Sequence, residues 1–557
     1  MLRIALCGLG YGLLALAQNS TLMNPFLPGF YPDPSCIFVP EFDDTFFCAS
    51  SSFLAFPGLP ITASRDLQSW TLISHAFNRP EQLPVFAGLQ SPSGGIWAPT
   101  LRYRDGLFYL VSTCVVDDLP ANDSSRWNNF IITTDNPYCS KCWSDPAYFT
   151  ADGYDPDIFW DDDGQAYVTW SLLWNVRPGI MQSTINVDTG EVGTALNVWN
   201  GTGGLAPEGP HIYKKGGHYY LLIAEGGTGL NHMVTIARSR KITGPFESNP
   251  VNPILSNANT TEYLQAVGHA DLFYDNAGNW WGTALSMRLN LQARAAPMGR
   301  ESVLYPVTWK DGEWPVLGHV QGYISSWPFP HSPAGEALPG IPVATSENID
   351  FTKADKVPAN LIYYGLPNAR SHKLLGEGLC LTPSSTGKTS LEKVTRISRR
   401  QSHTLFTYRV DVNWSPKKQG DESGVSVFVD PDNHFDLGIV QLPARKRGAG
   451  SSRYLQFQAK GNKTISQTTL TDFPADWGNG PITLEIKAFN ATHYAFSAGP
   501  AEHDSQLQTI AVAPSGLLQP YFTGAVVGVY TKAITSRSRA EACFTHWTYR
   551  GEAQYRD

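Results

Sequence analysis

The chain has 557 residues, which is long enough for two or three domains with sizeable cores. Its formal net charge of −8 gives no electrostatic reason to bind nucleic acid or an anionic membrane. With 42% hydrophobic and only 16% charged residues, and with 50 Gly and 40 Pro, the composition is typical of many short strands joined by turns. A neutral, hydroxyl-rich partner fits this surface better than a charged one.

Residues 1–17 predict a secretory signal peptide. Met1-Leu2-Arg3 is a short basic start, residues 4–16 are mostly apolar, and Ala15-Leu16-Ala17 is an A-x-A cleavage site. The apolar run is too short to span a bilayer stably, and no later segment does so. Seven N-x-S/T sequons agree with a eukaryotic secretory route, namely Asn19, Asn122, Asn200, Asn259, Asn413, Asn462 and Asn490. We therefore expect a secreted, extracellular glycoprotein with no membrane partner.

An aromatic-rich strand pattern recurs five times between residues 24 and 330. The copies begin at Asp44, Gly106, Gly164, Gly217 and Gly278, so the period is 53 to 62 residues. A period in this range, with short alternating strands and turn signals in each copy, is typical of a radial array. Residues 18–330 are therefore predicted to form a five-bladed β-propeller.

A chemically distinctive residue precedes each copy at a matched distance. Counting back nine residues from the four glycines gives Trp97, Asp155, Glu208 and His269, and counting back eleven from Asp44 gives Asp33. Each alone could be a turn or loop residue, but turn chemistry does not require carboxylates at the matched position. Because the innermost strands of a propeller line its central channel, we expect these five side chains to meet at one channel mouth.

The remainder of the chain has a different pattern. Residues 331–345 are rich in Pro and Gly and are predicted to be a linker or strap. Residues 346–557 contain short alternating strand signals without long helical periodicity, which predict a β-sandwich and make the whole chain all-β. The basic run Arg396-Ile397-Ser398-Arg399-Arg400 is interpreted as a solvated strand face.

Cysteines and an acidic triplet give three local predictions. After removal of Cys7 with the signal, seven cysteines remain, so at least one thiol is left free or bonds another chain. Cys36 and Cys48 lie on neighbouring predicted strands and could pair. Cys139-Ser140-Lys141-Cys142 lacks a βαβ context, which favours a local disulfide or plain burial over a redox motif. Asp161-Asp162-Asp163-Gly164 is interpreted as a hairpin turn and not a calcium loop.

The matched residues suggest a sugar-cleaving site. Three carboxylates in one channel mouth are costly to ionise together, so one can stay charged as a base while another keeps a proton. Cleavage of a glycosidic bond needs such an acid and base, and an inverting mechanism follows if they lie about 6.5–9.5 Å apart. Trp97 and Phe53 could stack on a sugar ring. His269 could hydrogen-bond a sugar hydroxyl or a carboxylate, ligate a cation on the propeller axis, or simply tie the blades together. No G-x-S-x-G, P-loop or H-E-x-x-H motif is present.

Several of these segments resemble glycoside hydrolase family 43, in the branch with a C-terminal β-sandwich. The resemblance rests on Asn24 to Ser35 (NPFLPGFYPDPS), Tyr154 to Phe159 (YDPDIF), Glu208 to Tyr213 (EGPHIY), Val267 to Asp271 (VGHAD) and Met298 to Glu301 (MGRE). It implies that Asp33 is the general base, that Asp155 raises the pKa of the acid and orients it, and that Glu208 is the general acid. It also implies an axial role for His269 and a substrate-binding role for Arg300.

The resemblance implies a secreted inverting glycoside hydrolase acting on plant cell-wall polysaccharide. We expect release of α-L-arabinofuranose side chains from arabinoxylan or arabinan, because Tyr154 places an aromatic residue beside Asp155. The alternatives are an exo-acting β-1,4-xylosidase on xylo-oligosaccharides and, from another class, a glycan-binding propeller without catalysis. No cofactor is required and no metal ligand set is assigned, although a structural cation on the propeller axis is one expectation. The sandwich is expected to add a wall to the pocket or to bind carbohydrate separately.

Overall fold

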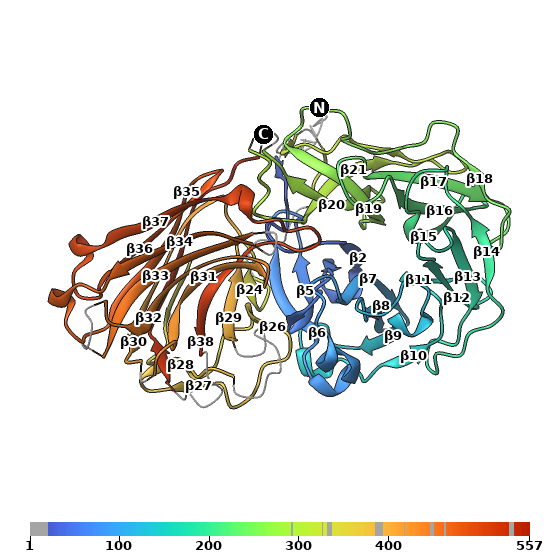
Figure 1. Ribbon diagram of the computed structural model, residues 1–557. Coiled ribbons are helices and arrows are strands. Elements are labelled where there is room, and N and C mark those ends of the chain that lie inside the picture. Colours follow the sequence, from blue (N-terminus) through green and yellow to red (C-terminus); the bar gives the residue numbers. More distant parts are fainter. Residues whose placement is uncertain are drawn as a thin grey trace, which may run out of the picture.

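The computed structural model describes residues 21–290, 293–325, 327–330, 337–384, 394–416, 418–445, 450–461, 464–533 and 540–556. It shows an all-β chain with a five-bladed propeller beside a two-sheet sandwich (Figure 1). The described helices are short 3-10 turns, and none is long or apolar enough to cross a membrane. The predicted signal segment and cleavage site, together with Cys7, Asn19 and Asn462, lie outside the described residues.

Each blade is an antiparallel sheet whose strands follow one another in chain order. Blade 1 contains β2 (Ser35–Val39), β3 (Thr45–Ala49), β5 (Gly58–Ser64) and β6 (Thr71–Phe77), and blade 2 contains β7 (Gly95–Arg104), β8 (Leu107–Val115), β9 (Trp127–Thr134) and β10 (Ala147–Phe149). Blade 3 contains β11 (Tyr154–Trp160), β12 (Ala166–Ser171), β13 (Ile180–Thr184) and β14 (Leu196–Trp199). Blade 4 contains β15 (Glu208–Lys215), β16 (His218–Glu225), β17 (Met233–Ser239) and β18 (Glu247–Ser248), and blade 5 contains β19 (Leu264–Tyr274), β20 (Trp280–Arg288), β21 (Glu301–Thr308) and β22 (Val316–Leu317).

The five-blade prediction is confirmed. The recurring aromatic segments are the second strands β3, β8, β12, β16 and β20, and the turn before each joins it to the first strand of its blade. Apolar side chains alternate along these strands and pack between blades; examples are Phe47 and Phe108 in one cluster and Tyr220 and Trp281 in another. The repeat period is therefore the distance between equivalent hairpins of successive blades.

The N-terminal segment closes the ring of blades. β1 (Leu22–Met23) pairs with β23 (Tyr323–Ile324), which follows the last strand of blade 5. The Asn24 side chain donates to the carbonyls of Leu304 and Gln321 at 2.8 and 2.9 Å and accepts from the Leu304 amide at 2.9 Å. The part of the predicted linker that is described adds β24 (Ile341–Pro342) to the outer edge of blade 1. It acts as a strap between the domains.

One guanidinium ties the innermost strands together on the channel axis. Arg102 of blade 2 donates to Asp157 of blade 3 at 2.6 Å and to Asp271 of blade 5 at 3.0 Å. His211 of blade 4 lies 3.2 Å from it, and Ser35 of blade 1 donates to Asp271 at 2.6 Å. Both aspartates are fully buried. Every blade thus contributes to one hydrogen-bonded cluster, which we call the axial hub.

The C-terminal domain is a β-sandwich. Its nine-stranded sheet contains β25 (Glu347–Asp350), β27 (His372–Leu375), β28 (Gly378–Leu381), β30 (Leu405–Trp414), β35 (Ile482–Asn490), β36 (His493–Pro500), β37 (Gln508–Pro514), β39 (Ala542–Phe544) and β40 (His546–Ala553). Its eight-stranded sheet contains β26 (Leu361–Tyr364), β29 (Val394–Arg400), β31 (Glu422–Asp430), β32 (Asn433–Pro443), β33 (Ser451–Gly461), β34 (Thr464–Asp472) and β38 (Val526–Lys532), with one further strand from the propeller. A single apolar core fills the space between the sheets.

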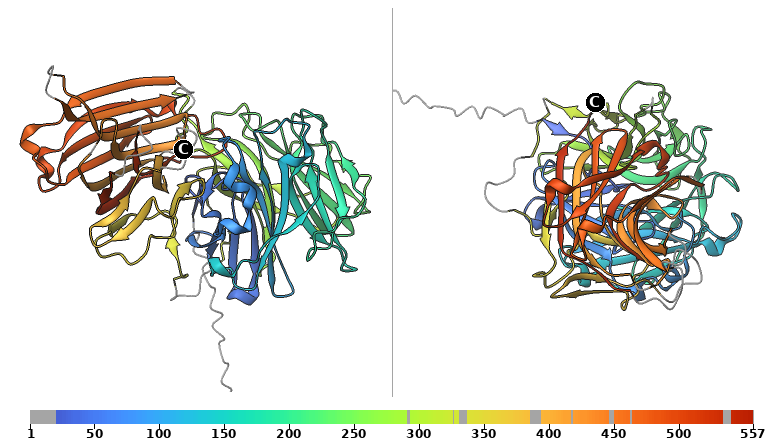
Figure 2. Two further views of the ribbon diagram at one scale, coloured as in Figure 1. Left: turned by 60° about the horizontal axis from the view of Figure 1, so that its bottom comes forward. Right: turned by 60° about the vertical axis from the view of Figure 1, so that its left-hand side comes forward.

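The two domains share a sheet. The strand contributed by the propeller is β4 (Ala55–Phe56) from blade 1, which pairs with β26 at the edge of the eight-stranded sheet. The sandwich accordingly lies beside the blue strands of blade 1, as the left view of Figure 2 shows. Since main-chain hydrogen bonds cross the boundary, the position of the sandwich against blade 1 is fixed by regular pairing as well as by side-chain contacts.

The interpretation of the basic run as a solvated face is wrong. Arg399 and Arg400 are only 3% and 4% exposed, because β29 lies next to β26 at the domain boundary. Arg399 forms an ion pair with Glu347 at 3.0 Å, and Arg400 donates to the Phe30 carbonyl of the propeller at 2.9 Å. The run therefore joins the domains. The local sequence does not reveal this, because it does not show which distant groups pair with the arginines.

The cysteine predictions are largely confirmed. Disulfides join Cys36 to Cys48 and Cys139 to Cys142, and a third, Cys380 to Cys543, links two sandwich strands. Cys114 is a free, buried thiol. The Asp161-Asp162-Asp163-Gly164 segment is a hairpin turn as predicted, and Lys214 pairs with its first two carboxylates.

We expect Arg102→Met to destabilise the propeller by about 3–5 kcal/mol, because it leaves two buried carboxylates without their cation. Arg177→Met is the matched control, since Arg177 is 65% exposed and pairs with Asp152 only at 3.7 Å; an exposed pair contributes less than about 1 kcal/mol. Urea unfolding measures both variants. Equal midpoints for Arg102→Met and the wild type would contradict the role of the hub.

Candidate active site

The backbone at the matched positions turns all five residues toward one end of the channel. Asp33, Asp155 and His269 have left-handed φ angles of 51°, 55° and 51°, and Ala98 and Gly209, each directly after a matched residue, have φ of 32° and 57°. Register shifts interrupt the first strands of blades 2 to 5 at these places. Such bulges re-aim side chains, and left-handed non-glycine residues are concentrated at functional sites. The repeat therefore encodes a conformation as well as a residue position.

Asp33 is held by two donors from different parts of the propeller. The Ser51 hydroxyl donates to its Oδ2 at 2.6 Å, and Arg300 Nη1 lies 3.3 Å from its Oδ1. Ser51 itself accepts from the Ala98 amide at 2.6 Å, so the blade 2 backbone helps to fix the carboxylate. Asp33 is 5% exposed. Both donors fix the orientation of the Asp33 carboxyl group.

Asp155 and Glu208 lie on neighbouring blades and are joined through short polar links. The Gly209 amide donates to Asp155 Oδ2 at 3.1 Å, and the Tyr154 hydroxyl donates to Glu208 Oε2 at 3.0 Å. A Cβ atom at position 209 would lie 2.9 Å from His269 Nε2, so glycine is needed for this approach. The two carboxylates and the imidazole therefore share one compact site.

The electrostatics of this pair favour a retained proton. Burial, followed by the charges of Glu208 and Asp33, raises the pKa of Asp155 well above its ordinary value. Burial also raises the pKa of Glu208 to about 7, while the Tyr154 hydrogen bond and the Arg300 charge act in the opposite direction. Because two buried carboxylates so close together cannot both ionise easily, the pair keeps a proton near neutral pH. The site thus contains a proton donor beside the hydrogen-bonded Asp33.

Aromatic rings form one wall of the site. Trp97 meets Tyr154 edge to face at 5.8 Å, and Tyr154 stacks on Trp127 at 5.3 Å. Phe53 stacks on Phe522 of the sandwich at 5.8 Å and is only 3% exposed. Trp97 and Phe522 are half-buried, so they have more surface available to a ligand than Phe53 has. The predicted contact of Phe53 with sugar stays a prediction, and its observed role is to support Phe522.

Arg300 connects the carboxylates to the sandwich domain. Its guanidinium lies 4.7 Å from the centre of the Phe522 ring, and its backbone amide donates to the Thr523 carbonyl at 3.0 Å. The side chain is 4% exposed, yet Nε and Nη2 have no partner among the described residues. Buried donors are nearly always paired in folded proteins, so these two donors indicate a polar ligand.

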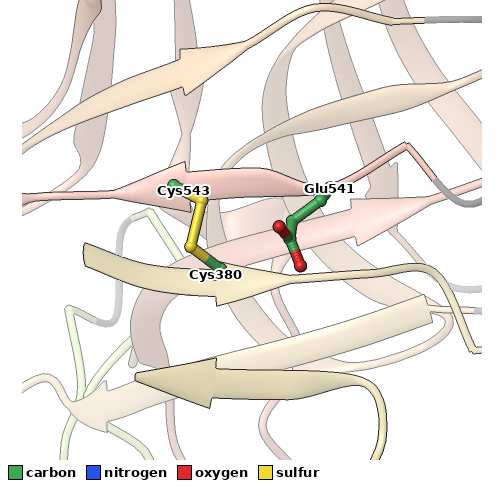
Figure 3. Close-up of side chains that lie close together, drawn as sticks. All are labelled: Cys380, Glu541 and Cys543. Carbon is green, nitrogen blue, oxygen red and sulfur yellow. A yellow bond between two sulfur atoms is a disulfide. The ribbon is translucent and has the colours of Figure 1, made fainter. Parts of the chain in front are cut away.

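His269 does not lie in a protein-built cation site. Its Nδ1 is 3.8 Å from Asp33 Oδ1, and burial lowers its pKa to about 4, so the imidazole is neutral. Among the described residues, the only three potential ligands that converge are Cys380, Glu541 and Cys543, and these two cysteines form a disulfide (Figure 3). The described residues around His269 therefore do not supply three protein ligands for a cation, and the structural cation on the propeller axis stays a prediction.

Sequence reasoning missed several residues of this site. Ser51 follows the first aromatic strand without a distinctive pattern, and Trp127 lies in an ordinary strand of blade 2. Phe522 comes from a sandwich loop far along the chain, and its position was implied only by the expectation that the sandwich adds a wall. The matched residues Asp33, Trp97, Asp155, Glu208 and His269, together with Tyr154 and Arg300, do lie together.

Comparisons with known proteins agree along the whole chain. The family model described as Glycosyl hydrolases family 43 matches residues 22–315, and one described as Beta xylosidase C-terminal Concanavalin A-like domain matches residues 355–550. A non-reducing end α-L-arabinofuranosidase of Bacteroides ovatus is 33% identical, with 99% of this chain and 98% of that protein aligned. A xylosidase/arabinosidase of Butyrivibrio fibrisolvens is 29% identical, with 94% and 98% aligned.

Solved structures share the complete fold. A xylan β-1,4-xylosidase from Bacillus halodurans C-125 superposes with a TM-score of 0.83 at 28% identity, covering 95% of this chain and all of that chain. A family 43 protein from Bacillus licheniformis gives 0.81 at 26% identity, covering 96% and all of that chain. With the propeller, the sandwich and the carboxylate-lined channel mouth, these matches show that the chain belongs to glycosyl hydrolases family 43.

Proposed function

We propose that the chain releases α-L-arabinofuranose side chains from arabinoxylan or arabinan with inversion at the anomeric carbon. The observation that carries the proposal is the Asp155 and Glu208 pair, which keeps a proton near neutral pH next to the hydrogen-bonded Asp33. A relative aligned over almost its whole length is a non-reducing end α-L-arabinofuranosidase, which supports the choice of arabinose.

In this mechanism Asp33 is the general base and Glu208 the general acid. Asp33 accepts a proton from a water molecule, and the resulting oxygen nucleophile bonds to the anomeric carbon. The glycosidic carbon–oxygen bond breaks, and Glu208 gives its proton to the leaving oxygen. The Asp155 and Glu208 pair retains that proton before the reaction, because two ionised carboxylates side by side would be unfavourable. Separate anchors, Ser51 for Asp33 and Tyr154 for Glu208, support separate roles for the two groups.

The remaining groups suit a small neutral sugar. Trp97 and Phe522 offer ring faces for the apolar side of a furanose or pyranose. The unpaired Nε and Nη2 of Arg300 can donate to sugar hydroxyls, and the neutral imidazole of His269 can donate or accept one hydrogen bond. A pocket of this kind binds one sugar unit at a chain end or branch.

A β-1,4-xylosidase acting on xylo-oligosaccharide ends is the second candidate. It is favoured by relatives that are β-xylosidases, such as one from Bacillus subtilis that is 35% identical over 54% of this chain. The two sugars differ in ring size while presenting similar hydroxyls, so the carboxylates serve either. We prefer arabinose because Tyr154 places an aromatic ring beside Asp155, in contact with both Glu208 and Trp97.

We further propose that the protein is secreted and glycosylated. Three disulfides are typical of an oxidising compartment. The side chains of Asn122, Asn200, Asn259 and Asn413 are exposed, which leaves room for glycans.

Glu208→Gln tests the role of the acid. We expect kcat/KM on arabinose-substituted xylan to fall by about 10²–10⁴. The loss should be smaller on a nitrophenyl arabinofuranoside, since nitrophenolate leaves without protonation. Glu247→Gln, on the exposed strand β18 of the same blade, is the control. Unchanged kcat/KM of Glu208→Gln on arabinose-substituted xylan would refute the assignment of Glu208 as the acid.

The identity of the released sugar decides between the two candidate substrates. Wild-type enzyme is incubated with singly and doubly substituted arabinoxylan and with xylo-oligosaccharides, and the monosaccharides are quantified by chromatography. Arabinose is the expected main product, because Tyr154 places an aromatic ring beside the carboxylate pair. Xylose as the dominant product would overturn the preference for arabinose.

Tyr154→Phe should move the alkaline limb of the pH profile upward. The tyrosine hydroxyl donates to Glu208 and lowers the pKa of that carboxyl, which burial raises to about 7. An acid must be protonated to act, so activity falls as the pH rises through its pKa. Removing the donor raises that pKa and extends activity to higher pH. The pH dependence of kcat/KM measures the shift, and a downward shift would contradict the assigned hydrogen bond.

Export can be measured directly. The full sequence, expressed in a eukaryotic secretory host, should appear in the medium as a glycoprotein whose mass falls on endoglycosidase treatment. Peptide mapping should find glycan at Asn122, Asn200 and Asn259, whose side chains are exposed. Retention of an unglycosylated chain inside the cell would contradict the proposal.

A further inference from the structure

The domains leave a cleft between them that the proposed chemistry does not use. It has a volume of about 490 Å³ and is lined from the propeller by Leu54, Phe86 and Gln90 and from the sandwich by Tyr363, Thr395 and Arg396. This volume lies within the range of about 300–1,000 Å³ that is typical of small-molecule sites. Asp33, Asp155, Glu208 and Arg300 are not among the described lining residues, so the cleft is separate from the channel mouth.

A narrow cavity adjoins the cleft on the side of the aromatic wall. The inner cavity has a volume of about 30 Å³ and shares Leu54, Tyr363, Tyr364 and Arg396 with the cleft. Its far end reaches Phe53, the ring that supports Phe522. The residues shared by the cleft and the inner cavity therefore come from both domains.

Four buried polar atoms surround the inner cavity without a partner among the described residues. They are Ser52 Oγ, Tyr364 Oη, Arg396 Nε and Ser398 Oγ. Ser52 and Ser398 are 0% and 2% exposed. A buried hydroxyl or guanidinium N–H without a hydrogen bond costs about 1–3 kcal/mol, so such atoms are rare unless a water or ligand satisfies them. Their concentration around one cavity indicates a polar occupant.

The residues that line the cleft and the inner cavity indicate which chemical class of ligand would bind there. The described residues that line the cleft and the cavity include no aspartate or glutamate, so nothing there would attract a cation. The charge of Arg396 is offset by Asp436 at 3.5 Å, so an anion has little net attraction. What remains is a tyrosine ring at position 363 with hydroxyl and amide groups around it, a combination suited to neutral sugars, which have an apolar ring face and many hydroxyls.

We propose that the cleft is a second carbohydrate site, which binds a neutral pentose oligosaccharide alongside the active site. The choice of ligand rests on the proposed function. The existence of the site rests on the cleft and on the unpaired Tyr364 Oη and Arg396 Nε, whose side chains line both the cleft and the inner cavity. A bound chain places a ring against Tyr363 and hydroxyls toward Tyr364 and Arg396. It holds the polysaccharide on the enzyme between cleavage events without taking part in them.

Titration calorimetry with the full-length Glu208→Gln variant tests this, because that variant binds substrate without consuming it. Xylohexaose and an arabinose-substituted xylo-oligosaccharide are the probes. We expect two sites per chain. Adding Tyr363→Ala should remove one site or weaken it at least tenfold, and Gln90→Ala, on the propeller side of the cleft, should weaken the same site. Tyr274→Ala, a 56% exposed tyrosine on blade 5, is the matched control and should leave both sites unchanged.

The outcomes separate the second site from the proposed function. One site that survives both Tyr363→Ala and Gln90→Ala would overturn the second site and mean that the cleft holds water only. Two sites that both survive these changes would overturn it as well. If wild-type enzyme releases no pentose but a single site is lost with Tyr363→Ala, the proposed function fails while the second site stands. If Tyr363→Ala does not fold, Gln90→Ala alone decides.

Discussion

The axial hub is the interaction on which the rest of the structure depends. Arg102 forms ion pairs with two fully buried aspartates from different blades, and His211 and Ser35 bring the other two blades into the same cluster. Burying these charges is favourable only if they stay paired and hydrogen-bonded. The ion pairs therefore fix the position of each innermost strand along the channel axis. Asp157 and Asp271 stand two residues after Asp155 and His269, so fixing the hub also fixes the residues of the mouth.

At the channel mouth, residues at equivalent positions of the repeated blades have different chemical surroundings. Left-handed residues at the matched positions or directly after them turn five side chains toward the channel mouth, but the surroundings of these side chains differ. Asp33 receives a hydroxyl and a guanidinium, whereas Asp155 and Glu208 face each other in a buried environment that raises both of their pKa values. Environment, and not residue type, thus distinguishes a base from an acid among three carboxylates. The sandwich completes the site by placing Phe522 against Arg300.

Much of this was predictable from the sequence because a propeller repeats. The spacing of the glycines predicted the blades, and the same spacing brought Asp33, Asp155 and Glu208 to one place. Contacts between domains were not predictable in this way, since no period relates Phe522 to Phe53. The burial of Arg399 and Arg400 was missed for the same reason: their partners, Glu347 and the Phe30 carbonyl, are distant in sequence, and a cluster of positive charge resembles a solvated face until those partners are known.

The anomeric configuration of the first sugar released tests the central claim most directly. If Asp33 activates water on one side of the sugar while Glu208 protonates the leaving oxygen on the other, the product forms with inverted configuration. Proton NMR of an aryl α-L-arabinofuranoside digest, recorded before mutarotation, should show β-L-arabinofuranose first. Initial appearance of the α-anomer would mean that a carboxylate attacks the sugar directly, and it would contradict the assignment of Asp33 as a base acting through water.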